Sequence, residues 1–98
     1  MRMAITDEYD FELLVNEAER LVLKHLESQL AEVSESVCRC GECVLDMAAY
    51  ALNNAKPMYR VSLLGSLYAH SLQGTAYERE ISDAVATAIE RVSSNPSH

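Results

Sequence analysis

The sequence predicts a mainly α-helical protein, a small single domain of three to four helices with one short extended or hairpin segment. Apolar residues recur at helical spacing through most of the chain. The alternating apolar pattern of a strand appears only between Tyr59 and His70, on either side of Gly65. The chain has 98 residues, which is enough for one domain with a thin core. Because such domains often gain stability by dimerising or by binding a metal, we expect a dimer.

Residues 8 to about 33 are predicted to form the first helix, capped by Thr6 or Asp7 and acidic in its first turn. Its apolar face would consist of Phe11, Leu14, Ala18, Leu21, Val22, His25 and Leu26. We interpret His25 as a core or interface histidine. The stretch 34–36 would end this helix.

Two further helices are predicted, from about Glu42 to Asn54 and from Thr75 to about Val92. Pro57 would help to end the second helix, because the residue before a proline is pushed out of the α region. Thr75 and Glu78 have the spacing of a capping box at the start of the third. We expect the first and third helices to pack together, with the second crossing them. The single domain would span residues 1–98, with a core from about 8 to 92 and a frayed tail at 93–98.

The net charge of −7 is unevenly distributed. Residues 7–35 contain nine acidic and two basic side chains, whereas residues 36–74 have a net charge of +1. Without a basic stripe the chain is not expected to bind nucleic acid directly, and only its middle third suits an anion. No apolar run approaches the roughly 18–20 residues of a spanning helix, and residues 1–10 lack the apolar core of a secretory signal. We therefore expect a cytoplasmic protein that does not enter a membrane.

Cys38, Cys40 and Cys43 form a C-x-C-x-x-C cluster at the start of the second predicted helix. Three thiols at this spacing can converge on one metal ion, and zinc prefers four ligands. Candidates for a fourth ligand are His25, His70, Glu42, Asp46, a water or a residue of a partner chain. Redox chemistry is a second interpretation, because a helix N-terminus lowers thiol pKa values. Three packed structural thiols are the third.

A short segment, Lys56-Pro57-Met58-Tyr59-Arg60, places two cations and an aromatic ring directly after the second predicted helix. A guanidinium group binds phosphate through two parallel hydrogen bonds, and a tyrosine or arginine can stack on a base. Arg39 adds a third cation about 15–20 Å away, one helix length. The alternative is a turn with solvated charges.

No catalytic arrangement can be recognised in the sequence. The histidines, His25, His70 and His98, lie outside any nucleophile–base motif. The three glycines are spread along the chain and do not form a phosphate-binding loop. We therefore expect no enzymatic activity.

Several motifs carry a family resemblance. They are C-x-C-x-x-C at 38–43, Asp46 three residues later, an A-L-N-N helix end at 51–54, P-x-Y at 57–59, and G-x-x-Y-A at 65–69. Together they resemble the late competence development protein family ComFB over roughly residues 8–92. The family pattern continues P-x-Y-V, whereas here Arg60 intervenes before Val61.

The resemblance implies a small, largely helical homodimer without catalytic activity. Some family members carry zinc on their cysteines, and others are receptors for cyclic dinucleotides, chiefly cyclic di-GMP, that act on competence, motility or cell size through protein partners. The zinc-bound version uses a further cysteine near the C-terminus, and residues 93–98 contain none. Cys38, Cys40 and Cys43 would therefore bind metal without a fourth cysteine.

The resemblance also implies a nucleotide site. Its candidate residues are Arg39, Asp46, Lys56, Tyr59 and Arg60. The arginines would contact phosphate or guanine edges, and Asp46 would accept hydrogen bonds from guanine. Three hypotheses follow: a cyclic dinucleotide-binding regulatory dimer, a zinc-stabilised scaffold, or a metal-free protein-interaction dimer.

Overall fold

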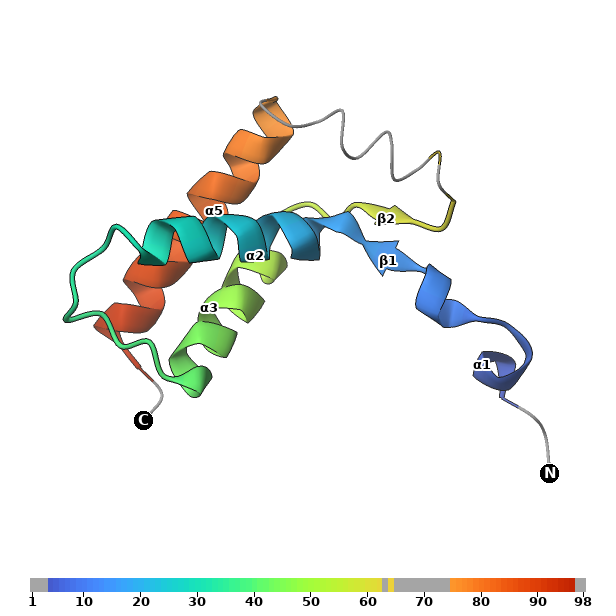
Figure 1. The fold of residues 1–98 in the computed structure, drawn as a ribbon, viewed down its shortest axis with the longest axis horizontal. Helices are drawn as coiled ribbons and strands as arrows, with labels where there is room; N and C mark the ends of the chain where they lie inside the picture. Colours follow the sequence, from blue (N-terminus) through green and yellow to red (C-terminus); the bar gives the residue numbers. More distant parts are fainter. Residues whose placement is uncertain (1–3, 63, 65–74, 97–98) are drawn as a thin grey trace.

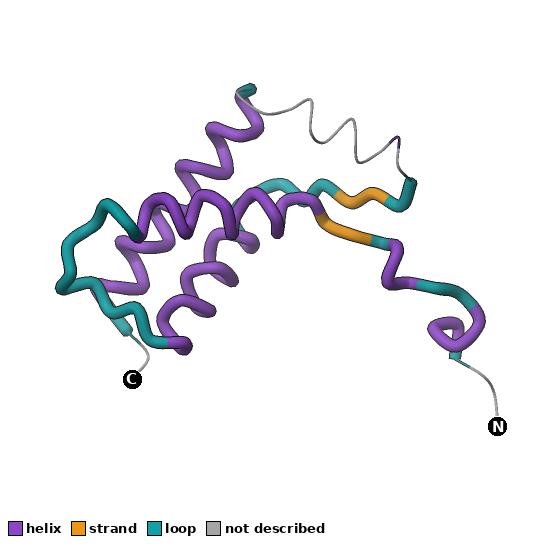
Figure 2. Tube along the Cα trace, in the orientation of Figure 1, coloured by secondary structure: helices purple, strands orange, loops and turns teal. Residues whose placement is uncertain are grey.

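In the described part of the chain, three long helices form the body of the molecule, and a two-stranded sheet lies at one end of it (Figure 1). The computed structural model describes residues 4–62, 64 and 75–96. The elements in chain order are α1 (Ile5–Glu8), a 3-10 helix η1 (Phe11–Leu13), β1 (Val15–Asn16), α2 (Glu17–Leu30), α3 (Gly41–Asn53), β2 (Tyr59–Arg60) and α5 (Ala76–Ser94). The predicted mainly α fold is confirmed (Figure 2).

The core lies where α5 packs against both α2 and α3. Its largest fully buried apolar side chains are Leu21 and Val22 from α2, Met47 from α3, and Ile81 and Val85 from α5. The buried residues of each helix follow helical spacing, as Cys43, Met47 and Ala51 do on α3, so each helix turns one apolar stripe inward. Burying each such side chain stabilises the fold by about 1.5–3 kcal/mol. The predicted packing of the first and third helices is confirmed.

The prediction of the first helix is wrong for residues 8–16. The helix α2 begins at Glu17, where the side chain of Asn16 accepts a hydrogen bond from the N–H of Ala18 at 3.1 Å. Thr6 and Asp7 lie inside α1, so neither caps α2. The helical spacing of residues 8–16 is overridden because β1 pairs with β2, a contact between residues more than 40 positions apart.

The two strands are antiparallel, with Val15 opposite Arg60 and Asn16 opposite Tyr59. Four residues make a marginal sheet, and neighbouring bonds reinforce it. The N–H of Glu17 donates to the carbonyl of Met58 at 2.7 Å, and the N–H of Met58 donates to Oδ1 of Asn16 at 2.8 Å. The predicted extended segment is thus present at Tyr59–Arg60. Its predicted continuation at 65–70, with the turn at Gly65, lies outside the described residues.

The second and third predicted helices are confirmed as α3 and α5. Thr75 occupies the N-cap position of α5, but its side chain makes no capping hydrogen bond. Ser93 and Ser94 belong to the last turn of α5, so this part of the predicted tail is helical. Among the described residues, no helix has the length and apolar character needed to cross a membrane.

Candidate functional site

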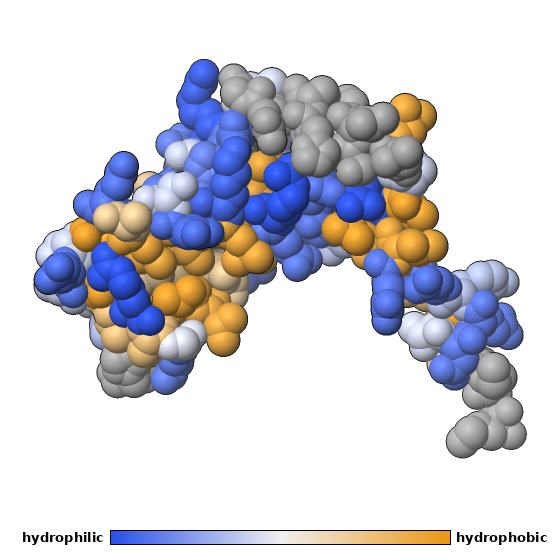
Figure 3. Space-filling view, viewed as in Figure 1, coloured by the Kyte–Doolittle hydropathy of each residue, from blue (hydrophilic) through white to orange (hydrophobic). Residues whose placement is uncertain are grey.

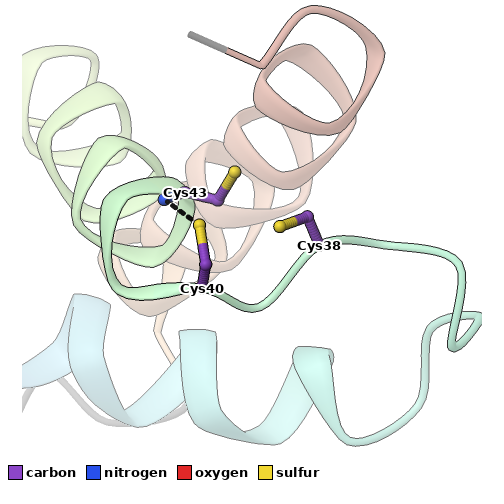
Figure 4. Close-up of side chains that lie close together, drawn as sticks. All are labelled: Cys38, Cys40 and Cys43. Carbon is purple, nitrogen blue, oxygen red and sulfur yellow. Dashed lines mark hydrogen bonds between the residues drawn. The ribbon is translucent and has the colours of Figure 1, made fainter. Parts of the chain in front are cut away.

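The three cysteines converge at the start of α3 (Figure 4). Cys38 lies in the preceding loop, Cys40 is the N-cap residue of α3, and Cys43 lies in its first turn. The N–H of Cys43 donates a hydrogen bond to Sγ of Cys40 at 3.4 Å. All three Sγ atoms lie within 4.8 Å of one another. The predicted convergence of the thiols is therefore confirmed.

The geometry fits a thiophilic metal such as zinc. Zinc–sulfur bonds of about 2.3 Å in a tetrahedral site place the sulfur atoms roughly 3.8 Å apart, so a small closure of the cluster would suffice. Without a metal, burial and, to a smaller extent, hydrogen bonding with Cys38 and Cys40 raise the pKa of Cys43 to about 12. Because the thiolate is the reactive form, Cys43 in this state is a poor redox nucleophile. The arrangement favours metal binding over redox chemistry.

Within the described residues, the group of metal-binding side chains comprises only these three cysteines. His25, a predicted candidate for the fourth ligand, lies elsewhere, with its Nε2 3.1 Å from Oε2 of Glu78 on α5. The carboxylates of Glu42 and Asp46 are not part of the group, and His70 lies outside the described residues. Cys40 is exposed, so a water or a partner chain can approach the cluster from that side.

A second candidate site lies at the opposite end of the body, along the segment 56–60. Lys56 and Tyr59 are exposed, with Tyr59 at 62%. The backbone of Lys56 is fixed on both sides: its N–H donates to the carboxylate of Glu80 at 2.9 Å, and its carbonyl accepts from the hydroxyl of Tyr77 at 2.7 Å. The segment therefore presents the Lys56 and Tyr59 side chains from a fixed backbone.

Arg60 is held by Glu17, which in the sequence stands out only as one of the acidic residues of the first predicted helix. Glu17 is 2% exposed and lies between two arginines. Its Oε2 accepts from Nε of Arg20 at 2.9 Å, and its Oε1 accepts from Nε of Arg60 at 2.6 Å. Hydrogen bonds from Arg20 and then Arg60 hold the pKa of Glu17 below its usual value, against the opposing effect of burial. The sequence could have indicated only the pairing of Glu17 with Arg20, which is three residues away. Arg60 is too distant in sequence for its pairing to be predicted.

Arg39 lies at the cysteine end and has a structural role there. Its guanidinium donates to the carbonyls of four residues at the end of α2 and in the following loop: Leu30, Val33, Ser34 and Val37. The loop between α2 and α3, which contains Arg39, and the segment 56–60 lie at opposite ends of the body (Figure 1). Of the five predicted nucleotide-binding residues, the structure groups Lys56, Tyr59 and Arg60, and places Arg39 apart from them. Asp46 is half-buried on α3.

Comparison with known proteins identifies the family. The family model for the late competence development protein ComFB matches residues 15–96. The chain belongs to the ComFB family. Among solved structures, the late competence protein ComFB from Bacillus subtilis has a TM-score of 0.71 and 24% sequence identity, covering 86% of this chain and 92% of that one. This likeness supports the ComFB fold. No curated protein sequence is significantly similar to the chain.

Proposed function

We propose that this ComFB-family chain is a cytoplasmic, non-enzymatic regulatory protein that binds a cyclic dinucleotide, cyclic di-GMP. It would act as a homodimer and through a protein partner in competence or motility. Support comes from the family match, since a relative is named for late competence. The observation that carries the proposal is the fixed segment 56–60, which presents Lys56 and Tyr59 beside Arg60.

The chemistry of these side chains suits a dianionic ligand with planar bases. Lys56 attracts a phosphate as a point charge, and the exposed ring of Tyr59 offers a face for a guanine to stack on. The Nε of Arg60 donates to Glu17, so the terminal N–H groups of Arg60 would be the ones to contact a phosphate or a guanine edge. Arg39 and Asp46 remain predictions for a ligand that spans two protomers.

The proposal is tested by isothermal titration of the purified protein with cyclic di-GMP, with cyclic di-AMP as a second titrant. Lys56→Ala and Tyr59→Ala should each weaken binding by roughly 10- to 100-fold, the loss of one charge-assisted contact or one stacked base. Arg91→Ala is the matched control, because Arg91 is an exposed arginine in the last turn of α5. Binding as tight as that of the wild type in both variants would remove this site.

A zinc-stabilised scaffold is a second candidate function, favoured by the convergence of three Sγ atoms within 4.8 Å. The protein would then serve as an interaction scaffold linked to competence or motility, and a metal-free form of the same scaffold is the remaining alternative. Metal analysis of the purified protein should find about one zinc per cluster. Cys43→Ser should lose that zinc, and a wild type purified without metal would point to the metal-free scaffold.

A further inference from the structure

Two side chains near the start of α5 hold the backbone of Lys56 from both sides. Oε2 of Glu80 accepts a hydrogen bond from the N–H of Lys56 at 2.9 Å, and the hydroxyl of Tyr77 donates one to the carbonyl of Lys56 at 2.7 Å. Tyr77 and Glu80 are three residues apart, so they lie on one face of the helix about one turn apart. We call this pair of residues the α5 clamp.

Both bonds of the α5 clamp act on the same residue. The N–H and the carbonyl of Lys56 lie on either side of its Cα atom, so holding both groups fixes the direction in which the side chain leaves the backbone. Pro57 adds to this restriction, because a proline disfavours the helical region for the residue before it and fixes its own φ near −65°. The fold therefore directs the Lys56 side chain before any ligand is present.

The other end of this short stretch is held from a different helix. The N–H of Met58 donates to Oδ1 of Asn16, the N-cap residue of α2, at 2.8 Å. The carbonyl of Met58 accepts from the N–H of Glu17 at 2.7 Å. Residues 56–58 thus form a bridge between α5 and the start of α2, and Lys56 lies at the α5 end of that bridge.

Hydrogen bonding, and not burial, fixes Lys56. Lys56 and Pro57 are exposed, and the surface over the first turns of α5 is largely hydrophilic (Figure 3). Burial and then the charge of Glu80 raise the pKa of Tyr77, so its hydroxyl keeps its proton and remains a donor at neutral pH. The direction of the Lys56 side chain therefore depends on two polar contacts, each of which a single substitution can remove.

We infer that Tyr77 and Glu80 are positioning residues for the nucleotide site, which direct the ammonium group of Lys56 toward a ligand phosphate without contacting the ligand themselves. The inference rests on the proposed function and deepens it. A contact that is directed in advance avoids the cost of ordering it on binding. The ordering of one residue corresponds to roughly a 5- to 30-fold change in affinity.

The test is calorimetric titration of cyclic di-GMP into a matched pair of variants, Glu80→Gln and Glu80→Ala. Both variants remove the charge, but only the glutamine keeps an oxygen that can accept from the N–H of Lys56. The alanine variant should bind roughly 5- to 30-fold more weakly than the glutamine variant. Tyr77→Phe, which removes only the hydroxyl, should lose a similar factor relative to the wild type. Glu90→Ala, at an exposed glutamate further along α5, should bind as the wild type does.

Repeating these substitutions in a Lys56→Ala background separates positioning from other roles. There, Glu80→Ala and Tyr77→Phe should weaken binding no further, because the side chain that they direct is gone. A direct ligand contact, or a general loosening of the fold, would weaken binding in both backgrounds. Equal losses in the two backgrounds, or equal affinities of Glu80→Gln and Glu80→Ala, would overturn the inference and leave the proposed function standing. A wild type that does not bind cyclic di-GMP would overturn both.

Discussion

At the residue scale, Glu17 shows how one buried carboxylate connects the first long helix to the candidate nucleotide segment. It accepts from Arg20 on its own helix and from Arg60 on β2. The two arginines are partly exposed, with 38% and 27% of their side chains accessible, whereas the Glu17 side chain is 3% accessible. Its negative charge is therefore compensated at a place where water cannot do so, and Arg60 is oriented as a result.

Replacing Glu17 tests this contact. Glu17→Gln should lower the free energy of unfolding by about 2–3 kcal/mol, because two guanidinium groups lose their charged acceptor. The pKa of Glu17 is lowered in the folded state, so its stabilising contribution is present above the usual value of 4.5 and is lost as the pH falls through the lowered pKa. Urea unfolding at pH 7 and pH 3 should show a difference between wild type and variant that shrinks at the lower pH. An equal difference at both values would contradict this.

Arg39 gives a second prediction at this scale. Arg39→Ala should destabilise the fold by about 1 kcal/mol, since four carbonyl acceptors at the end of α2 lose a common donor that water replaces in part. Arg39→Lys should recover little of this loss, because an ammonium group cannot reach several acceptors in a fork. Thermal unfolding measures both. If the alanine variant instead loses only nucleotide binding, with unchanged stability, Arg39 is a ligand contact as the family resemblance implied.

At the element scale, sequence patterning predicted well the helices whose apolar stripes pack against other helices. The stripe Ile81–Val92 of α5 is apolar at helical spacing and buried against two other helices, so local pattern and tertiary packing agree. The same spacing at Phe11 and Leu14 led to a wrong helix, because this segment has no helix to pack against and β1 pairs with β2 instead. The cysteine cluster was predictable because its ligands are close in sequence, whereas the Glu17–Arg60 pair was not.

The side chain of Asn16 connects the start of α2 to the segment that leads into β2. Asn16→Ala should cost about 1–2 kcal/mol, because Oδ1 accepts from the N–H groups of both Ala18 and Met58. Hydrogen exchange at these two amides should accelerate, and β2 should loosen with them. Asn53→Ala is the control, because Asn53 is an exposed asparagine at the end of α3. Unchanged protection at Met58 would show that the sheet does not depend on this contact.

At the scale of the whole molecule, the two candidate sites lie at opposite ends of one helical body. The cysteine cluster lies at the start of α3, and the sheet end carries the segment 56–60. Metal binding and nucleotide binding are thus predicted to be separable. Removing metal with a chelator should lower the midpoint of thermal unfolding, because the segment 38–43 loses its bound ion. The affinity for cyclic di-GMP should stay within about two-fold of its value before chelation. If the chelator lowers the thermal midpoint and the cyclic di-GMP affinity together, the two ends of the body are coupled.

The most direct test of the central claim is a titration of the isotopically labelled wild-type protein with cyclic di-GMP, followed by amide chemical shifts. We expect saturable shifts centred on Lys56, Tyr59 and Arg60, and extending to the amide of Glu17 through its contact with Arg60. The amides of Arg39 and Asp46 would move only if one ligand spans two protomers. No shift at any amide up to millimolar nucleotide, or shifts confined to the cysteine end, would contradict the proposed site.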